Sequence, residues 1–155
     1  MKANELRIGN YLHAIINQEI DRGNGIIEDV EVCEVVKVMG FDPFQNMIWC
    51  DSELYIENYN LQPIPLTGEW LERFGFEKAS GDYVRYDLKA TEDVYILYAD
   101  DYSCGLFNSK ESEENELGVI PNWETIKHVH QLQNLYFALT GEELQADETD
   151  QKVNL

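Results

Sequence analysis

The chain has 155 residues, 44% of them apolar and 12% aromatic, so it is long enough to bury a core and too rich in core-forming residues to be disordered. Lys and Arg number 11 against 30 Asp and Glu, which gives a net charge of −19. Nucleic acids and anionic membrane surfaces are bound through basic patches, whereas the cations here are dispersed with no two adjacent. We therefore expect no direct nucleic-acid binding and no membrane binding.

The cysteines predict the compartment. Cys33, Cys50 and Cys104 are odd in number, far apart and without C-x-x-C spacing, which argues against a disulfide framework or a zinc ribbon. The first residues lack the apolar stretch of a signal peptide, and no apolar run reaches the roughly 18 residues of a membrane span. The sequence favours a cytoplasmic protein with reduced thiols and no cofactor.

The first part of the chain reads as short strands separated by turns. Strand-like patterns occupy residues 7–16, 30–39, 47–50 and 54–56. Turn formers at residues 23–25 and 40–43 provide the positive or fixed φ angles of tight connections. Residues 1–62 are therefore predicted to form a small β domain, a curled antiparallel sheet of the SH3-like barrel kind.

A second subregion is predicted for residues 63–144. Pro63 and Pro65 mark its start, because proline fixes φ and withholds a ladder donor. Thr67 is the expected N-cap of a short helix that Gly75 ends. Strands are expected at residues 83–88, 94–98 and 105–108, with 94–98 central because it is apolar at every position.

The strongest helical pattern covers residues 123–140, with Asn122 as N-cap and Gly141 as the residue that ends the helix. Its apolar residues fill an arc of roughly 200°, so we expect it to pack on two sides. The polar residues 145–155 that follow are predicted to be a frayed acidic tail. Together these elements predict an α+β fold.

Acidic residues give the first candidate binding site. Glu111, Glu113, Glu114 and Glu116 form a nearly pure run of charge, which a mobile surface loop would also show. Acids arranged at the spacing of phosphates would compete for the site of a basic protein partner. Solubility alone is the plainer interpretation of the same charge.

Two polar residues in the helical pattern are further binding candidates. Gln133 falls inside the apolar arc, where it either tethers a neighbouring loop through the backbone or lines a pocket. His130 forms an H-x-H pair with His128, a metal-ligand spacing on a strand but a divergent one on a helix. We expect no metal site there.

The sequence contains only weak indications of a catalytic site. The acid pairs Glu92–Asp93 and Asp100–Asp101 bracket the apolar strand, and paired acids can hold Mg²⁺ or transfer protons. No cysteine or serine has the surroundings of a nucleophile, and residues 23–25 lack the lysine of a phosphate loop. No catalytic residue is therefore assigned, and a non-enzyme is favoured over an enzyme.

Four segments resemble those of an uncharacterised family of small acidic bacterial and phage or prophage proteins. They are ELRIGNY at residues 5–11, LQPIPLT at 61–67, WLERFGF at 70–76 and VHQLQNLYFALTGEEL at 129–144. The last is the most specific, and residues 78–121 match no family pattern. The resemblance implies an origin on phage or other mobile DNA and carries no known activity.

These observations predict a non-catalytic binding or accessory protein that acts through protein contacts, as an acidic modulator of a host or phage protein. The partner is expected to be a protein with a basic surface. Two alternatives stay open: a small metal-assisted hydrolase using the acids near Asp100, and a virion or assembly component. The oligomeric state does not follow from the sequence.

Overall fold

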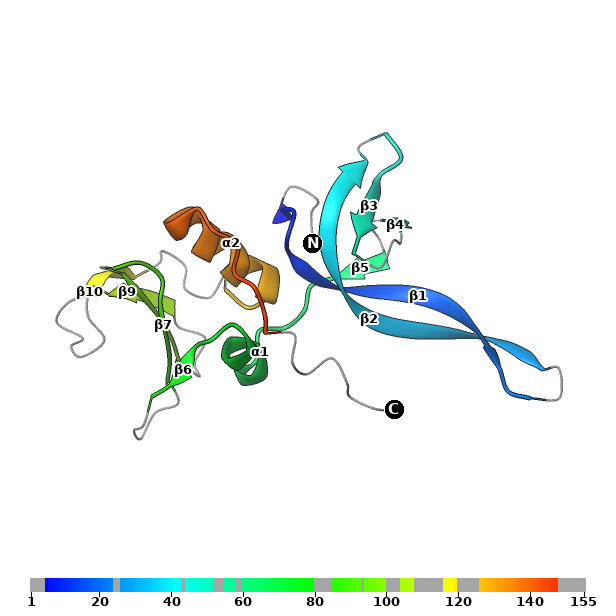
Figure 1. The fold of residues 1–155 in the computed structure, drawn as a ribbon, viewed down its shortest axis with the longest axis horizontal. Coiled ribbons are helices and arrows are strands. Elements are labelled where there is room, and N and C mark those ends of the chain that lie inside the picture. The colour runs from blue at the N-terminus through cyan, green and yellow to red at the C-terminus, as the bar shows by residue number, and fades with distance from the viewer. Residues whose placement is uncertain are drawn as a thin grey trace. The chain divides into compact units, whose positions relative to one another are not determined.

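A computed structural model describes the chain over residues 5–23, 26–42, 44–51, 55–57, 60–79, 85–92, 94–99, 104–107, 116–119 and 126–147. The chain divides into two compact units, Met1–Ile64 (unit 1) and Pro65–Leu155 (unit 2). Each unit contains an antiparallel sheet, and the described helices belong to unit 2 (Figure 1). The fold class is therefore α+β, with more strand than helix.

Unit 1 is a five-stranded antiparallel sheet in the order β4-β3-β2-β1-β5. Its strands are β1 (Tyr11–Asp21), β2 (Ile27–Asp42), β3 (Met47–Cys50), β4 (Tyr55–Glu57) and β5 (Leu61–Gln62). Over the described residues the sheet is open, with β4 and β5 at its edges, and no closed barrel forms. The SH3-like assignment stays a prediction.

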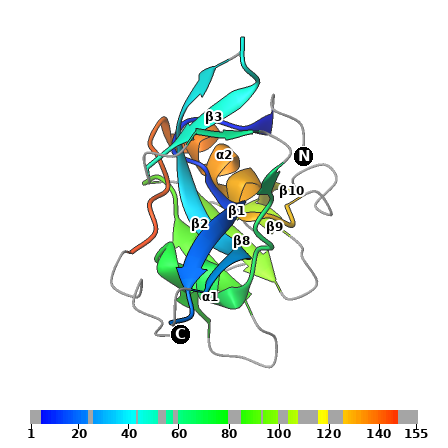
Figure 2. The same cartoon turned by 90° about the vertical axis from the view of Figure 1, so that its right-hand side faces the viewer.

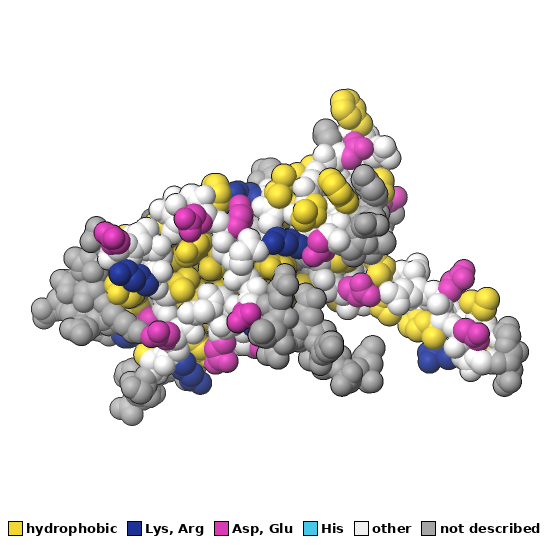
Figure 3. Space-filling model, in the orientation of Figure 1, with side chains coloured by type: hydrophobic (Ala, Val, Ile, Leu, Met, Phe, Trp, Pro, Cys, Tyr) yellow, Lys and Arg dark blue, Asp and Glu magenta, His cyan; other side chains and the backbone are white. Residues whose placement is uncertain are grey.

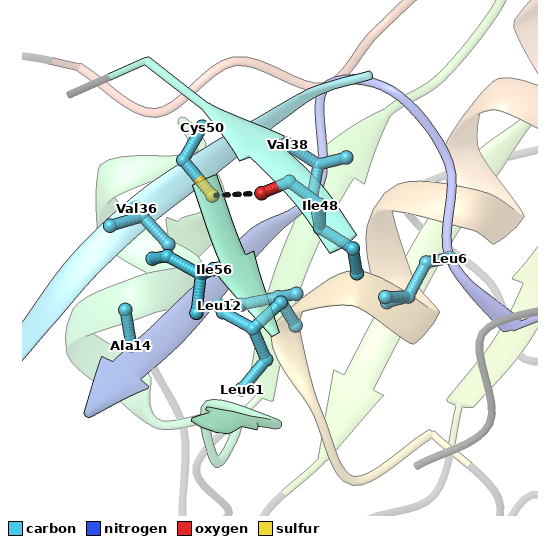
Figure 4. Close-up of a cluster of buried hydrophobic side chains, with 9 residues drawn as sticks. All are labelled: Leu6, Leu12, Ala14, Val36, Val38, Ile48, Cys50, Ile56 and Leu61. Atoms are coloured by element: carbon cyan, nitrogen blue, oxygen red, sulfur yellow. Dashed lines mark hydrogen bonds between the residues drawn. The ribbon is translucent and has the colours of Figure 1, made fainter. Parts of the chain in front are cut away.

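One face of this sheet carries the core of unit 1. Alternate residues of a strand point to the same side, which places Leu12 and Ala14 of β1 beside Val36 and Val38 of β2. The Cys50 thiol lies in the same cluster, with its Sγ 4.0 Å from the Ile48 carbonyl oxygen (Figure 4). The full set is Leu6, Leu12, Ala14, Val36, Val38, Ile48, Cys50, Ile56 and Leu61.

The predicted turn at residues 40–43 is wrong, because β2 continues through Gly40 to Asp42. A β-bulge falls between Val38 and Gly40, which pair with Cys50 and Trp49, so β2 carries one extra residue. The turn comes later, where Asp42 Oδ1 accepts the N–H groups of Phe44 and Gln45 at 2.9 and 3.1 Å. Met47–Cys50 forms the strand that the sequence predicts.

Unit 2 contains a second sheet in the order β10-β9-β8-β7-β6. Its strands are β6 (Glu77–Lys78), β7 (Arg85–Lys89), β8 (Tyr95–Ala99), β9 (Cys104–Phe107) and β10 (Glu116–Val119). The apolar strand β8 is central, as the sequence predicts. The edge strands β6 and β10 are not predicted, because each is short and neither shows an extended alternation of apolar and polar residues.

Helix α1 (Gly68–Arg73) has the predicted caps. The Thr67 side chain accepts the Trp70 N–H at 3.4 Å, and Gly75 has φ +80°. Glycine at the start of the helix allows a close approach of β7. A Cβ on Gly68 would clash with the hydroxyl group of the Tyr86 side chain in β7, so α1 and β7 are in close contact at this position.

Helix α2 (Val129–Thr140) is shorter than the helix predicted for residues 123–140. It ends as predicted, with Gly141 at φ +76°. Its start is displaced because the chain before it is extended: the Leu66 N–H donates to the Lys127 carbonyl at 2.8 Å, and His128 bridges to Pro65. Residues 121–125, with the predicted cap Asn122, lie outside the described residues.

The predicted frayed tail is wrong for its described part, residues 145–147. Ala146 is 8% exposed and the preceding Leu144 is 5% exposed. The Asp147 N–H donates to the Arg73 carbonyl of α1 at 2.8 Å. The chain therefore packs back against α1 after α2 ends, and the acids beyond Asp147 lie outside the described residues.

Candidate protein-binding surface

The strands β1 and β2 extend beyond the rest of the sheet as a two-stranded ribbon. They pair from Tyr11↔Lys37 to Asp21↔Ile27, whereas β5 pairs with β1 only at His13 and Ala14. Among the described strands, none pairs with the ribbon between Ile15↔Cys33 and its turn. This part, residues 15–33, is called the arm. At about 3.4 Å per residue it is about 20 Å long, and it twists along its length (Figure 1; Figure 2).

The two faces of the arm differ in chemistry. The face that continues the core of unit 1 carries half-buried Ile16, Ile20, Val30 and Val32. Its polar residues are partnered: Gln18 donates to Glu34 at 2.9 Å, and Glu28 is paired with Arg22. The opposite face carries four exposed carboxylates, which belong to Glu19, Asp21, Asp29 and Glu31. Acidic side chains are visible along the arm in Figure 3.

Glu19 and Asp29 are directly paired across the two strands. Like charges in directly opposite positions destabilise a ribbon, by about 0.2–1 kcal/mol for such a pair. Asn17↔Glu31 and Asp21↔Ile27 on either side bring further acids to this face. The one cation of the arm, Arg22, has its Nε 3.0 Å from the carboxylate of Glu28 on the other face. Among the described residues of the arm, the acidic face therefore has no cation that would offset the repulsion between its carboxylates.

The arm exposes two isoleucines next to its turn, of which Ile27 lies on the acidic face opposite Asp21. Ile26 is 60% exposed and Ile27 is 66% exposed. The Gly23 N–H donates to Asp21 Oδ1 at 2.8 Å, and the Arg22 N–H donates to the Ile26 carbonyl at 3.0 Å. The described residues at the end of the arm thus expose two isoleucines, with Ile27 directly opposite Asp21.

The two polar residues that the sequence singles out on α2 lie in the interior of unit 2. Gln133 is fully buried, and its Nε2 donates to the Leu144 carbonyl at 3.2 Å. It acts as the backbone tether that was one of its two predicted roles. His130 is 2% exposed, and its ring stacks at 5.8 Å on the ring of His128, the N-cap of α2. Neither Gln133 nor His130 reaches the surface.

The acidic run of the sequence is only partly described. The backbone of Glu116 is in β10, where it pairs with Phe107, so the run ends in a strand rather than in a loop. Glu111, Glu113 and Glu114 lie outside the described residues. The sequence argument missed the arm, although acids at alternate positions on both sides of the turn at residues 23–25 are a signal that could have found it.

A catalytic centre finds no support in the part of the chain that the structure describes. No three His, Cys, Asp or Glu side chains there lie close enough together to hold a metal ion. Asp100 and Asp101, the acids of the hydrolase hypothesis, lie outside that part. The buried carboxylate of Asp87 is paired with Arg85, with Oδ1 2.9 Å from Nε and Oδ2 3.1 Å from a terminal guanidinium nitrogen. This pair is internal to one strand and exposes no reactive group.

The two buried thiols have raised pKa values. Desolvation and the Asp51 carboxylate raise the pKa of Cys50 to about 11. Burial raises the pKa of Cys104 to about 12. A nucleophilic cysteine needs a lowered pKa and access to solvent, so neither residue is suited to covalent catalysis.

Comparisons of the chain with protein-family models, curated proteins and solved structures gave no match. In the described part of the chain, neither helix combines the length and apolar character needed to cross a membrane.

Proposed function

We propose that this protein is a non-catalytic accessory protein of phage or prophage type, and that its arm binds a partner protein with a basic surface. The arm is placed against cationic groups of the partner, and the isoleucines of its turn contact apolar surface beside them. The cytoplasm is the expected compartment. The protein modulates its partner by covering the partner's basic site.

The observation that supports this most strongly is the facing pair Glu19 and Asp29 on an arm that no described strand covers. The pair costs stability in the free protein and gains favourable interactions when cations approach. The total charge of −19 adds a long-range attraction for the same class of partner. Exposed Ile26 and Ile27 supply the apolar contact that fixes a position.

Affinity capture with charge-neutralised variants tests this proposal. The variant E19Q/D29N/E31Q removes three negative charges from the arm. The matched control E72Q/E92Q/E142Q removes three from exposed positions of unit 2. Each protein is used as bait in lysate from a bacterial host, and a captured protein is then purified and titrated against both variants.

We expect the arm variant to bind the purified partner at least about tenfold more weakly than wild type, and the control variant to bind within about threefold. Affinity should also fall between about 50 mM and about 300 mM salt, because screening shortens the range of surface charges. Equal binding by the arm variant and wild type would refute the proposal.

A further inference from the structure

A second exposed feature of unit 1 lies on β3, away from the arm. The Trp49 side chain is 45% exposed and points away from the core, since Ile48 and Cys50 on either side of it are buried. In the described part of the chain, Trp49 is the one tryptophan with this exposure. Large exposed aromatic side chains of this kind are enriched at protein interfaces.

The strand beside Trp49 is adapted to the indole ring. Trp49 pairs with Gly40 of β2, and a Cβ on Gly40 would lie 3.4 Å from the indole Cε3. Glycine weakens a strand and often marks a close approach. The adjacent bulge adds Met39, which is 42% exposed. Gly40 therefore supports one side of the indole while much of the ring stays exposed.

Trp49 pairs with Gly40 on one side and with Tyr55 of β4 on the other, and carboxylates lie beyond these neighbours. Met47 shares the face of Trp49 and pairs with Asp42 on one side and with Glu57 on the other. Both acids are thus diagonal neighbours of Trp49, at about 7–8 Å between Cα atoms. Asp51 follows β3, and its Oδ1 accepts the Lys37 N–H at 3.0 Å. Trp49, Met39, Asp42, Asp51 and Glu57 together are called the Trp49 face.

Figure 3 shows hydrophobic side chains exposed over β2 and β3 with acidic side chains next to them. An exposed aromatic ring with carboxylates nearby attracts a planar cation, which stacks on the ring and donates to the carboxylate oxygens. Guanidinium has both properties, whereas ammonium is a compact and strongly hydrated point charge. The chemistry of the face is therefore selective among cations.

We propose that the Trp49 face binds an arginine side chain of a partner protein. A second copy of this chain is a poor occupant, because it brings a further −19 charge and only 11 cations. A nucleic acid is excluded by the same sign of charge. This inference goes beyond the function proposed for the arm, because it concerns other residues, another ligand group and a preference between arginine and lysine.

The test uses the full chain and two short peptides, one of alternating arginine and glycine and one of alternating lysine and glycine. Binding to wild type and to every variant is measured by isothermal titration calorimetry, and in wild type the NMR shift of the Trp49 indole N–H, identified by its absence in Trp49→Phe, locates the contact. We expect wild type to bind the arginine peptide about three- to fivefold more tightly than the lysine peptide. Trp49→Ala should remove this preference, and Trp49→Phe should reduce it.

Ile27→Ala is the control, since it removes an apolar side chain that is more exposed than Trp49 from the other end of unit 1. It should keep the arginine preference, as should the arm variant E19Q/D29N/E31Q, so the Trp49 face can succeed or fail separately from the arm. An unchanged preference in Trp49→Ala would overturn the proposal. So would loss of the preference in the arm variant, or a dimer in sedimentation that Trp49→Ala abolishes.

Discussion

The two units differ in where their large apolar side chains lie. Both units contain buried polar groups with partners: in unit 2 Gln133 donates to the Leu144 carbonyl, and in unit 1 the Asn10 Oδ1 accepts the Arg7 N–H at 2.8 Å. In unit 1, several large apolar side chains are also exposed. Among the described residues, the exposed large apolar side chains all belong to unit 1: Ile8, Ile26, Ile27, Val35, Met39, Phe41, Phe44 and Trp49.

This difference separates structural from recognition roles. A buried polar group that is hydrogen-bonded contributes to one specific packing, and removing its partner costs about 1–3 kcal/mol. A contiguous exposed apolar surface contributes little to folding and marks contact with other molecules. Both units have a core of their own, and the binding surfaces that we propose lie on unit 1.

Thiol chemistry should show the largest contrast within the chain. The pKa of Cys50 lies two units above its ordinary 9.0, at about 11, which lowers its thiolate fraction about a hundredfold below pH 9. Cys33 on the arm is exposed. We expect iodoacetamide to modify Cys33 at least about a hundredfold faster than Cys50 or Cys104, as mass spectrometry of the folded protein will show.

The raised pKa of Cys50 also makes the stability of the folded protein depend on pH. The folded state holds the Cys50 proton more tightly than the unfolded state, so the thiol's contribution to stability is complete below pH 9.0 and declines as pH rises toward 11.

In the iodoacetamide experiment, modification of Cys50 at the rate of Cys33 in folded protein would show that the core of unit 1 opens freely.

Two glycine substitutions compare the close packing of unit 2 with the open surface of unit 1. Gly68→Ala places a methyl group 2.4 Å from the Tyr86 hydroxyl oxygen, whereas Gly40→Ala meets the indole of Trp49 at 3.4 Å. We expect Gly68→Ala to lower the free energy of unfolding by about 1–3 kcal/mol. Gly40→Ala should change it by less than about 0.5 kcal/mol, because an exposed indole can move aside.

Urea unfolding measures both variants. Adding Tyr86→Phe to Gly68→Ala removes the clashing oxygen, so the double variant should recover part of the loss. If Gly68→Ala is as stable as wild type, or if Tyr86→Phe recovers nothing, the contact between α1 and β7 is looser than described.

The smallest expected effect concerns the facing acids of the arm. Glu19→Gln or Asp29→Asn should raise the free energy of unfolding by about 0.2–1 kcal/mol, because each removes a like-charge repulsion. Thermal unfolding at low salt measures the gain, and added salt should reduce it. Glu72→Gln on α1 is the control. A loss of stability in both arm variants would show that the acids make favourable contacts within the arm.

The sequence predicted best those features that depend on local chemistry. Thr67, Gly75 and Gly141 mark helix ends because caps and left-handed residues act within one turn. The sequence misplaced the bounds of elements that depend on residues far away in the chain. The start of α2 follows from pairing with residues 65–66, and the continuation of β2 through Gly40 follows from Trp49.

Local sequence patterns also could not identify the candidate binding surface. Gln133 and His130 stood out because they are polar residues in an apolar pattern, and both are satisfied or stacked inside unit 2. Glu19 and Asp29 are ordinary acids in an acidic chain. They became a candidate only once the register of β1 and β2 placed them opposite each other.

The segment after α2 joins the two helices of unit 2 through its backbone. Its Leu144 carbonyl is held by Gln133 of α2, and its Asp147 N–H is held by the Arg73 carbonyl of α1. Changes in residues 142–147 therefore act on both helices at once, so their energetic effects will not add independently to those of substitutions in either helix. A chain shortened to Thr140 would lose both attachments together.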